Sequence, residues 1–189
     1  KHSAELYQKL KKKAENIPIV WGGIHPSLLP EQCLEESYID YVVIGEGEYA
    51  LCNLVDSHLE GTSWYLEEYS SINNLWFKSK RWKNPYLNPL IQDLDSLPFI
   101  DRDILYEQKP VFKKDLSIST GRGCPFSCSF CASDALNRVY KKNSLGKFVR
   151  QRSVESVLSE LTLCKRRYAP ASVYFTDDVF TLSVDWLSR

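Results

Sequence analysis

The sequence predicts an α/β fold, and two observations support that class. Apolar, strand-like runs alternate with amphipathic helical stretches through the first 61 residues, and the alternation resumes near residue 115. A proline-punctuated region separates the two parts. Helices and strands that alternate along a chain are typical of parallel sheets covered by helices. We therefore expect two α/β parts joined by a connector.

Five segments in the first third follow one another as helix, strand, helix, strand and helix. They span residues 3–16, 17–23, 29–37, 39–48 and 48–61. Leu6, Leu10 and Ala14 form one apolar stripe on the first helix, and both strands end in glycine-rich turns. The fifth segment has apolar residues at helical spacing, and we expect Gly61 to end it.

The remaining segments resume this pattern after an irregular stretch. Residues 73–82 read as a small hairpin and residues 84–103 as an extended connector. Strands are expected at 116–120 and 172–178, with a long helix at 153–169 capped by Ser153 and the first turns of another helix at 183–189. The long helix places five residues on one face: Val154, Val157, Leu158, Leu161 and Cys164.

Composition excludes several classes of protein. Lys plus Arg and Asp plus Glu are balanced at 24 each, so the overall charge does not indicate a nucleic-acid partner. No apolar run is long enough for a membrane helix, and no signal peptide opens the chain. Six cysteines without a secretion signal indicate a reducing, cytoplasmic compartment. Because the chain has no methionine and ends on a helix-like stretch, we expect a fragment of a longer protein.

The most informative motif is the run GRGCPFSCSFCAS at residues 121–133, which places Cys124, Cys128 and Cys131 within eight positions. A structural zinc site takes four ligands, and no further Cys or His pair lies nearby, which disfavours zinc. Thiolates also hold iron–sulfur clusters, and three of them would leave one iron of a four-iron cube open to a ligand. Gly121 and Gly123 permit tight turns whose N–H groups can face an anionic cluster.

This motif resembles that of the radical S-adenosylmethionine (SAM) superfamily, in which C-x-x-x-C-x-x-C follows the first strand of a (β/α) barrel. The resemblance implies a [4Fe-4S] cluster held by the three cysteines and SAM bound at the open iron. It further implies reductive cleavage of SAM to a 5′-deoxyadenosyl radical. Phe130 matches the aromatic position near the adenine of SAM.

The strand at 172–178 ends in Asp177 and Asp178, where a carboxylate could bind the ammonium group of SAM. This strand end resembles that of cobalamin-dependent members of the superfamily. Because side chains alternate along a strand, only one of the two acids can point into the site. A helix cap or a turn is the alternative interpretation of this acidic pair.

Residues 20–48 resemble the C-terminal half of the Rossmann-like cobalamin-binding domain fused to many radical SAM enzymes. In that resemblance, Gly22 and Gly23 admit the nucleotide tail of cobalamin. The turn of Gly45, Glu46 and Gly47 is also typical of this fusion. The implied fold is the C-terminal part of a cobalamin-binding domain (residues 1–62), a hairpin and connector (63–114), and the start of a partial (β/α) radical SAM barrel (115–189).

Three other features favour plainer interpretations. Residues 56–61 spell the Asp-x-His-x-x-Gly pattern of a cobalt ligand, but His58 lies in a predicted helix after the glycine pair, so we interpret it as a surface histidine. Cys33, Cys52 and Cys164 fall among leucines and are expected to be buried thiols. The cationic run 138–152 could contact RNA or a phosphate, but a solvated loop is favoured.

The sequence thus predicts a cobalamin-dependent radical SAM enzyme that methylates or cyclises an unactivated carbon. A small-molecule substrate and a flavodoxin- or ferredoxin-type electron donor would be its partners. An RNA methylthiotransferase-type enzyme is the alternative radical enzyme. A zinc-stabilised or electron-transfer module is the non-enzymatic alternative.

Overall fold

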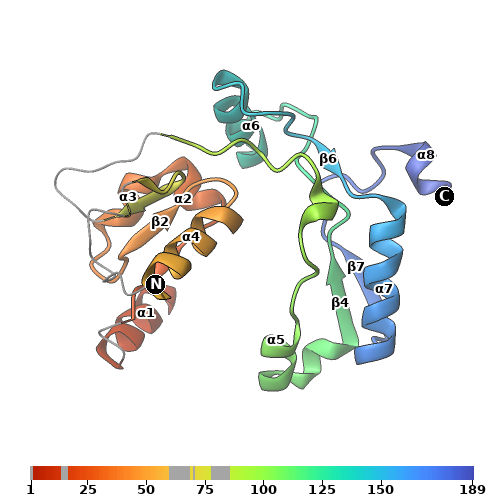
Figure 1. Cartoon of the computed structure of the whole chain (residues 1–189), viewed down its shortest axis with the longest axis horizontal. Helices are drawn as coiled ribbons and strands as arrows, with labels where there is room; N and C mark the ends of the chain where they lie inside the picture. The colour runs from red at the N-terminus through yellow and green to blue at the C-terminus, as the bar shows by residue number, and fades with distance from the viewer. Residues whose placement is uncertain (1, 14–16, 60–68, 70, 78–85) are drawn as a thin grey trace. The chain divides into compact units, whose positions relative to one another are not determined.

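The computed structural model describes residues 2–13, 17–59, 69, 71–77 and 86–189, and these residues form two compact units. Unit 1 comprises residues 1–90 and 130–145, and unit 2 comprises residues 91–129 and 146–189. Figure 1 shows the elements of each unit along the coloured chain. The chain therefore returns to unit 1 after leaving it. The predicted boundaries after residues 62 and 114 divide the sequence differently and stay predictions.

Unit 1 is built around a three-stranded sheet with the order β1–β2–β3. β1 (Val20–Trp21) is parallel to β2 (Tyr41–Val43), and β3 (Leu75–Phe77) is antiparallel to β2. The helices of this unit are α1 (His2–Lys13), α2 (Ile24–Leu28), α3 (Pro30–Glu35), α4 (Glu48–Leu59) and α6 (Ala132–Lys142). The parallel β1–β2 pair confirms the predicted alternation of helices and strands.

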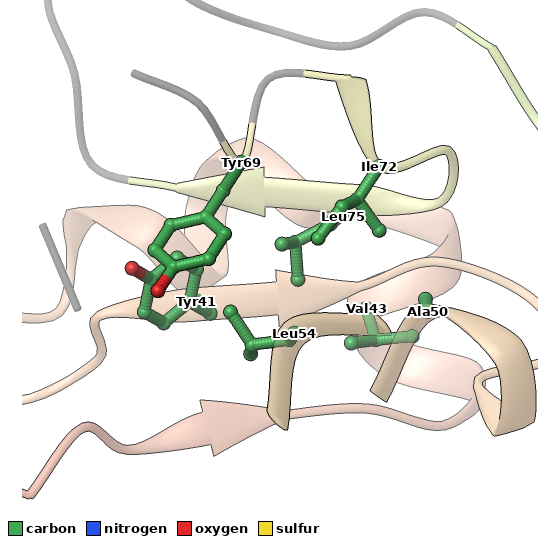
Figure 2. Packing of buried hydrophobic residues seen from close by; sticks show 7 residues of the cluster. All are labelled: Tyr41, Val43, Ala50, Leu54, Tyr69, Ile72 and Leu75. Atoms are coloured by element: carbon green, nitrogen blue, oxygen red, sulfur yellow. The ribbon is translucent and has the colours of Figure 1, made fainter. Parts of the chain in front are cut away.

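The core of unit 1 lies on both faces of β2, whose three residues are all buried. Side chains alternate between the two faces of a strand, so Tyr41 and Val43 share one face and Val42 has the other. Figure 2 shows Ala50 and Leu54 of α4 on the side of Tyr41 and Val43. A second cluster surrounds Val42 and contains Cys33, Tyr38, Ile39 and Ile44.

Unit 2 contains two short sheets. β4 (Asp115–Ile118) is parallel to β7 (Ser172–Phe175), and β5 (Gly121–Arg122) is antiparallel to β6 (Arg150–Gln151). Helix α7 (Val154–Tyr168) lies between β6 and β7 in the chain. The long helix thus precedes the second strand of the parallel pair β4–β7, in the predicted order of strand, helix and strand. The remaining elements are η2 (Leu94–Ser96), α5 (Asp103–Gln108), η3 (Pro110–Lys114) and α8 (Val184–Leu187).

Helix α7 begins where the sequence predicted, because Ser153 caps it. The Ser153 hydroxyl accepts a hydrogen bond from the N–H of Ser156 at 3.0 Å. The carboxylate of Asp95, in η2, accepts the Ser153 N–H at 3.1 Å. Burial would raise the pKa of Asp95, but the hydrogen bonds from Ser153 and Ser156 lower it below its ordinary value. The start of α7 is thereby fastened to the connector.

A buried ionic group joins α7 to the connector and to the segments beside β4. Glu160 pairs with Arg102 at 2.8 Å and with Arg152 at 2.6 Å, and its side chain is only 3% exposed. Arg102 also donates to the carbonyl of Ser117 in β4, and Arg152 donates to the carbonyl of Ser119. The two guanidinium groups provide the partners that a buried carboxylate requires.

Several predictions about individual elements were wrong. The cationic run 138–152 is not one solvated loop: it contains the end of α6 and strand β6, and Arg150 is buried with a 2.9 Å hydrogen bond to the carbonyl of Ile91. Cys52 is exposed on α4, whereas Cys33 and Cys164 are buried as predicted. On α7, Leu158 is exposed and Glu160 takes a place on the buried face.

Two further expectations concern residues at or beyond the edge of the described ranges. Leu6 and Leu10, the stripe of the first predicted helix, are exposed on α1, while Ala14 lies outside the described residues, as does Gly61. Of the predicted hairpin at 73–82, the first strand is β3, and residues 78–82 also lie outside them. Among the described residues, no helix combines the length and the apolar character needed to cross a membrane.

Replacing Glu160 with Gln is expected to lower the free energy of unfolding by about 3–5 kcal/mol, because two buried guanidinium groups would lose their anionic partner. Urea unfolding of the purified chain measures this change. Glu155→Gln, in the exposed first turn of the same helix, is the matched control and should cost less than about 1 kcal/mol. Equal losses in the two variants would contradict a special role for the buried carboxylate.

The thiols of the folded chain are expected to differ in their reactivity. Burial raises the pKa of both Cys33 and Cys164, and nearby Glu36 and Glu160 respectively add to the rise. Iodoacetamide should therefore alkylate these two thiols much more slowly than the exposed Cys52. Mass spectrometry of peptides after timed alkylation gives the rates, with the urea-unfolded chain as the control. Similar rates at Cys52 and Cys164 in the folded chain would argue against this packing.

Candidate functional site

The glycine pair Gly22–Gly23 follows β1 directly and leaves the main chain uncovered. Gly23 has a φ of 103°, a conformation that residues with a side chain rarely adopt. A Cβ atom built on Gly23 would meet no atom within 4 Å, and one on Gly22 would lie 3.8 Å from Val43 Cβ. Both glycines are exposed. Unit 1 therefore presents bare backbone at this strand end, as a ligand that packs on the main chain requires.

The turn of Gly45, Glu46 and Gly47 follows β2, the parallel neighbour of β1. The carboxyl ends of parallel strands lie at one edge of a sheet, so both glycine turns are found at the same edge. Ser27 joins them: its hydroxyl accepts the N–H of Gly45 at 2.7 Å and donates to the carbonyl of Gly23 at 2.6 Å. The structure thus brings together the five residues predicted for this part of the site.

Two further residues hold the second turn. Asn74 accepts the N–H of Ile44 on its carbonyl at 2.9 Å and donates from its side chain to the carbonyl of Glu46 at 3.1 Å. The hydroxyl of Tyr140, on α6, accepts the N–H of Glu46 at 3.3 Å. Residues from α2, the start of β3 and α6 therefore converge on one turn, although up to 94 positions separate them in the sequence.

The histidines His25 and His58 both lie in helices. His25 is exposed in α2, where its ring contacts Trp21 edge-on at 5.3 Å and its Nε2 lies 3.3 Å from Gln32 Oε1. His58 lies in the last turn of α4. The predicted helical position of His58 is confirmed, but its side chain is partly buried and not fully exposed at the surface.

In unit 2, Asp177 fixes the chain where it enters the cysteine loop. Its carboxylate accepts the N–H of Thr120 at 3.0 Å and the hydroxyl of Thr120 at 2.7 Å. Thr120 is buried, and it follows β4 just as Asp177 follows β7. Asp177 therefore acts as a clamp between the ends of two parallel strands. Asp178, which comes next, is exposed.

Gly121 and Gly123 give the cysteine loop its path beside β6. A Cβ on Gly121 would lie 2.7 Å from the carbonyl oxygen of Arg150, and one on Gly123 would lie 2.3 Å from that of Phe148. Gly123 also has a φ of 86°, which disfavours any other residue. Only a residue without a side chain permits these close contacts. They are consistent with the sequence prediction that the two glycines permit tight turns.

The three predicted cluster cysteines are reduced and reachable from solvent. Cys128 is exposed, and Cys124 and Cys131 are partly exposed, with no disulfide at any of them. Cys124 and Cys128 belong to unit 2, whereas Cys131 lies in the segment 130–145 of unit 1 and occupies the N-cap position of α6. Among the described residues, no three metal-ligating side chains lie together as a preformed metal site. Phe130, beside Cys131, is 91% exposed.

A small cavity of about 110 Å³ lies next to the start of this loop, within unit 2. It is lined by residues of the connector and of the segment after β4: Leu94, Leu97, Pro98, Phe99, Ile100, Ser119, Gly121 and Arg122. Arg152 and Glu160 also line it, so its polar wall is the buried ionic group described above. We assign no ligand to this cavity.

Sequence reasoning missed Ser27, Asn74 and Tyr140. Ser27 lies four residues after Gly23 in a short helix, and nothing in the sequence distinguishes it from any other helical serine. Asn74 has a φ of 66°, which Asn tolerates better than most residues, but only the structure reveals that conformation. Tyr140 was hidden in the cationic run, where one buried aromatic among basic residues was the available clue.

Comparison with known proteins shows which proteins this chain resembles. A B12 binding domain model matches residues 1–55. An uncharacterized methyltransferase of Pyrococcus horikoshii is 36% identical over 89% of this chain, and a putative methylthiotransferase of Methanocaldococcus jannaschii is 31% identical over 88%. The anaerobic magnesium-protoporphyrin IX monomethyl ester cyclase of Rubrivivax gelatinosus is 32% identical over 74%.

The match covers only part of the length of each of these relatives. This chain spans 35%, 32% and 26% of their respective lengths, in the order given.

A solved structure shares the fold. The radical S-adenosylmethionine methyltransferase TsrM from Kitasatospora setae, described with tryptophan substrate and a SAM analogue, matches 97% of this chain and 34% of its own. The TM-score is 0.66 at 23% sequence identity. The domain model covers the glycine turns at Gly22–Gly23 and Gly45–Gly47, and the relatives and this fold extend over most of the chain. The chain belongs to the family of radical SAM enzymes that carry a cobalamin-binding domain.

Proposed function

We propose that this chain is the cofactor-binding part of a cobalamin-dependent radical SAM enzyme that uses a [4Fe-4S] cluster. The observation that carries the proposal is the loop at 121–131. It combines three reduced, accessible thiols with two glycines that have no space for a side chain. Such a donor set fits an iron–sulfur cluster, which thiolates hold. When bound, the cluster and SAM would supply the 5′-deoxyadenosyl radical.

The residues of the loop would have distinct roles. Cys124, Cys128 and Cys131 would each donate a thiolate to iron. Asp177 would not bind SAM directly, because its carboxylate is engaged by Thr120, and it would instead hold the loop at the end of β4. Asp178 is the better candidate for the ammonium group of SAM, since it is the exposed member of the pair. Phe130 would cover the adenine with its exposed ring.

Cobalamin would bind at the edge of the unit 1 sheet that carries both glycine turns. The uncovered backbone at Gly22 and Gly23 fits a large ligand, because no side chain or neighbouring atom blocks Gly23. The B12 binding domain model over residues 1–55 covers these turns and supports their assignment. Gly45, Glu46 and Gly47 would complete this edge.

The proposed reaction is methyl transfer to, or cyclisation of, an unactivated carbon in a small-molecule substrate. The relatives named as a methyltransferase and as a cyclase support this pair of outcomes. A flavodoxin- or ferredoxin-type protein would supply the electron, and the cytoplasm would provide the reducing conditions. For the sequence segments we retain the division into a cobalamin-binding part (1–62), a connector (63–114) and the start of the barrel (115–189).

A methylthiotransferase reaction is the second candidate, and the relative of that name favours it. Enzymes of that type would need further cluster cysteines in the first part of the chain. Cys33 and Cys52 lie on helices α3 and α4, and Cys33 is buried. Helical positions and burial suit these residues poorly as cluster ligands, so we favour methylation or cyclisation. A zinc or electron-transfer module is the non-enzymatic alternative, and metal analysis separates it from the cluster.

Anaerobic reconstitution with iron and sulfide is expected to load about four iron atoms per chain together with acid-labile sulfide. Cys128→Ala should lose most of this iron, since it removes one of the three thiolate ligands. Cys52→Ala is the matched control: it removes another exposed thiol and should load as the wild type does. One zinc per chain without sulfide, or normal loading of the Cys128 variant, would contradict the cluster.

The full chain is expected to bind hydroxocobalamin, and binding should weaken by about tenfold or more when Gly23 is replaced with Val. The new side chain would stand on the open backbone and impose strain at a positive φ. Equilibrium dialysis with absorbance detection measures the affinity. Tyr49→Phe, at an exposed position of α4, is the control. Equal affinities of the Gly23 variant and the wild type would place cobalamin elsewhere.

A further inference from the structure

The turn at Gly45–Gly47 depends on side chains from other segments, and Tyr140 supplies one of its supports. Three successive backbone N–H groups at the end of β2 are paired: Ile44 with the Asn74 carbonyl, Gly45 with the Ser27 hydroxyl and Glu46 with the Tyr140 hydroxyl. Unpaired N–H groups are costly where the backbone is buried or partly buried. These partners therefore select one shape of the turn.

Tyr140 also explains why position 45 is a glycine. A Cβ on Gly45 would lie 1.7 Å from the hydroxyl oxygen of Tyr140 and 3.0 Å from its Cζ. The φ of Gly45 is 71°, so a side chain would be strained there as well. By contrast, a Cβ on Gly23 would meet nothing within 4 Å. The two turns thus omit side chains for different reasons: Gly23 leaves its space open, whereas Gly45 gives its space to Tyr140.

Helix α6 brings Tyr140 to this turn and is itself anchored in unit 1. Tyr140 is 3% exposed, and its carbonyl accepts the N–H of Leu145 at 3.1 Å. The carbonyl of Leu145 in turn accepts the N–H of Leu90 at 2.8 Å. The other end of α6 starts at the third predicted cluster cysteine, Cys131, which is its N-cap residue. A single helix therefore joins this cysteine to the turn.

We propose that Tyr140 is a positioning residue for cobalamin: its hydroxyl and ring hold Gly45 and Glu46 in the conformation in which this turn meets the cofactor. This inference rests on the proposed function, since it assumes that the turn faces cobalamin. It adds α6 to the cobalamin-binding part of the molecule, although α6 lies more than 80 residues beyond Gly47 in the sequence. Tyr140 acts through the turn and need not touch the cofactor.

The test compares Tyr140→Phe with the wild type in the full 189-residue chain without a cluster. The variant keeps the ring and removes the acceptor of the Glu46 N–H. One hydrogen bond of ordinary strength corresponds to about a fivefold change, so the dissociation constant for hydroxocobalamin should rise about fivefold. Hydrogen exchange of the Glu46 amide in the cobalamin-free chain should accelerate by a similar factor. Tyr49→Phe, at an exposed tyrosine of the same unit, should change neither quantity.

A double-mutant cycle adds a readout that general destabilisation would not produce. Gly45→Ala alone should weaken cobalamin binding strongly, because its methyl group overlaps the Tyr140 hydroxyl. In the Tyr140→Phe background the same change should cost several-fold less, because the nearest remaining ring atom is 3.0 Å away. Thermal unfolding of each variant, measured without cobalamin, shows whether the chain is folded.

The outcomes separate this inference from the proposed function. Weaker binding and faster Glu46 exchange in Tyr140→Phe, with non-additive effects in the cycle, support the inference. If the wild type binds cobalamin and Tyr140→Phe binds within twofold of it, the inference is overturned and the proposed function stands. If the wild type does not bind cobalamin, both fall, and Glu46 exchange then reports only whether the hydroxyl shapes the turn.

Discussion

Tight turns at the ends of parallel strands depend on partners for their backbone polar groups, and this constraint organises both halves of the molecule. At the end of β2, the N–H groups of Gly45 and Glu46 are accepted by Ser27 and Tyr140. At the end of β4, the N–H of Thr120 is accepted by the carboxylate of Asp177. In each case the side chain comes from another segment, so these turns take their shape only when the fold is complete.

The two units use different means to hold their turns. In unit 1, neutral hydroxyl and amide groups form directional hydrogen bonds to the turn, and burying them carries no large desolvation cost. Unit 2 relies on charge: Asp177 at the loop, and Glu160 between Arg102 and Arg152 behind it. A charged support is stronger but tolerates little change, because each buried ion requires its partner. The base of the cysteine loop is thus held by charged groups, whereas the turns of unit 1 are held by neutral ones.

Local sequence signals predicted several of the helices and strands, but they did not reveal the side chains that support the turns. Ser153 was recognised as a cap because capping involves neighbouring residues, and the structure confirms it. The alternation of β1, β2, β4 and β7 with helices was evident from apolar periodicity. Asp177 was expected to bind a ligand, because its contact with Thr120 spans 57 positions and leaves no local signal. Glu160 was not singled out, because its partner Arg102 comes from a distant segment. Such pairings are decided by tertiary structure, which periodicity does not report.

Phe130 has a consequence of its own. Its aromatic ring is 91% exposed to water. Covering such a side chain with an apolar surface is favourable by about 1.5–3 kcal/mol of free energy. Any flat, apolar-faced molecule that settles beside Cys131 gains this free energy without a new polar contact. A nucleoside base that covers Phe130, as we propose for SAM, would be held partly by this apolar contact.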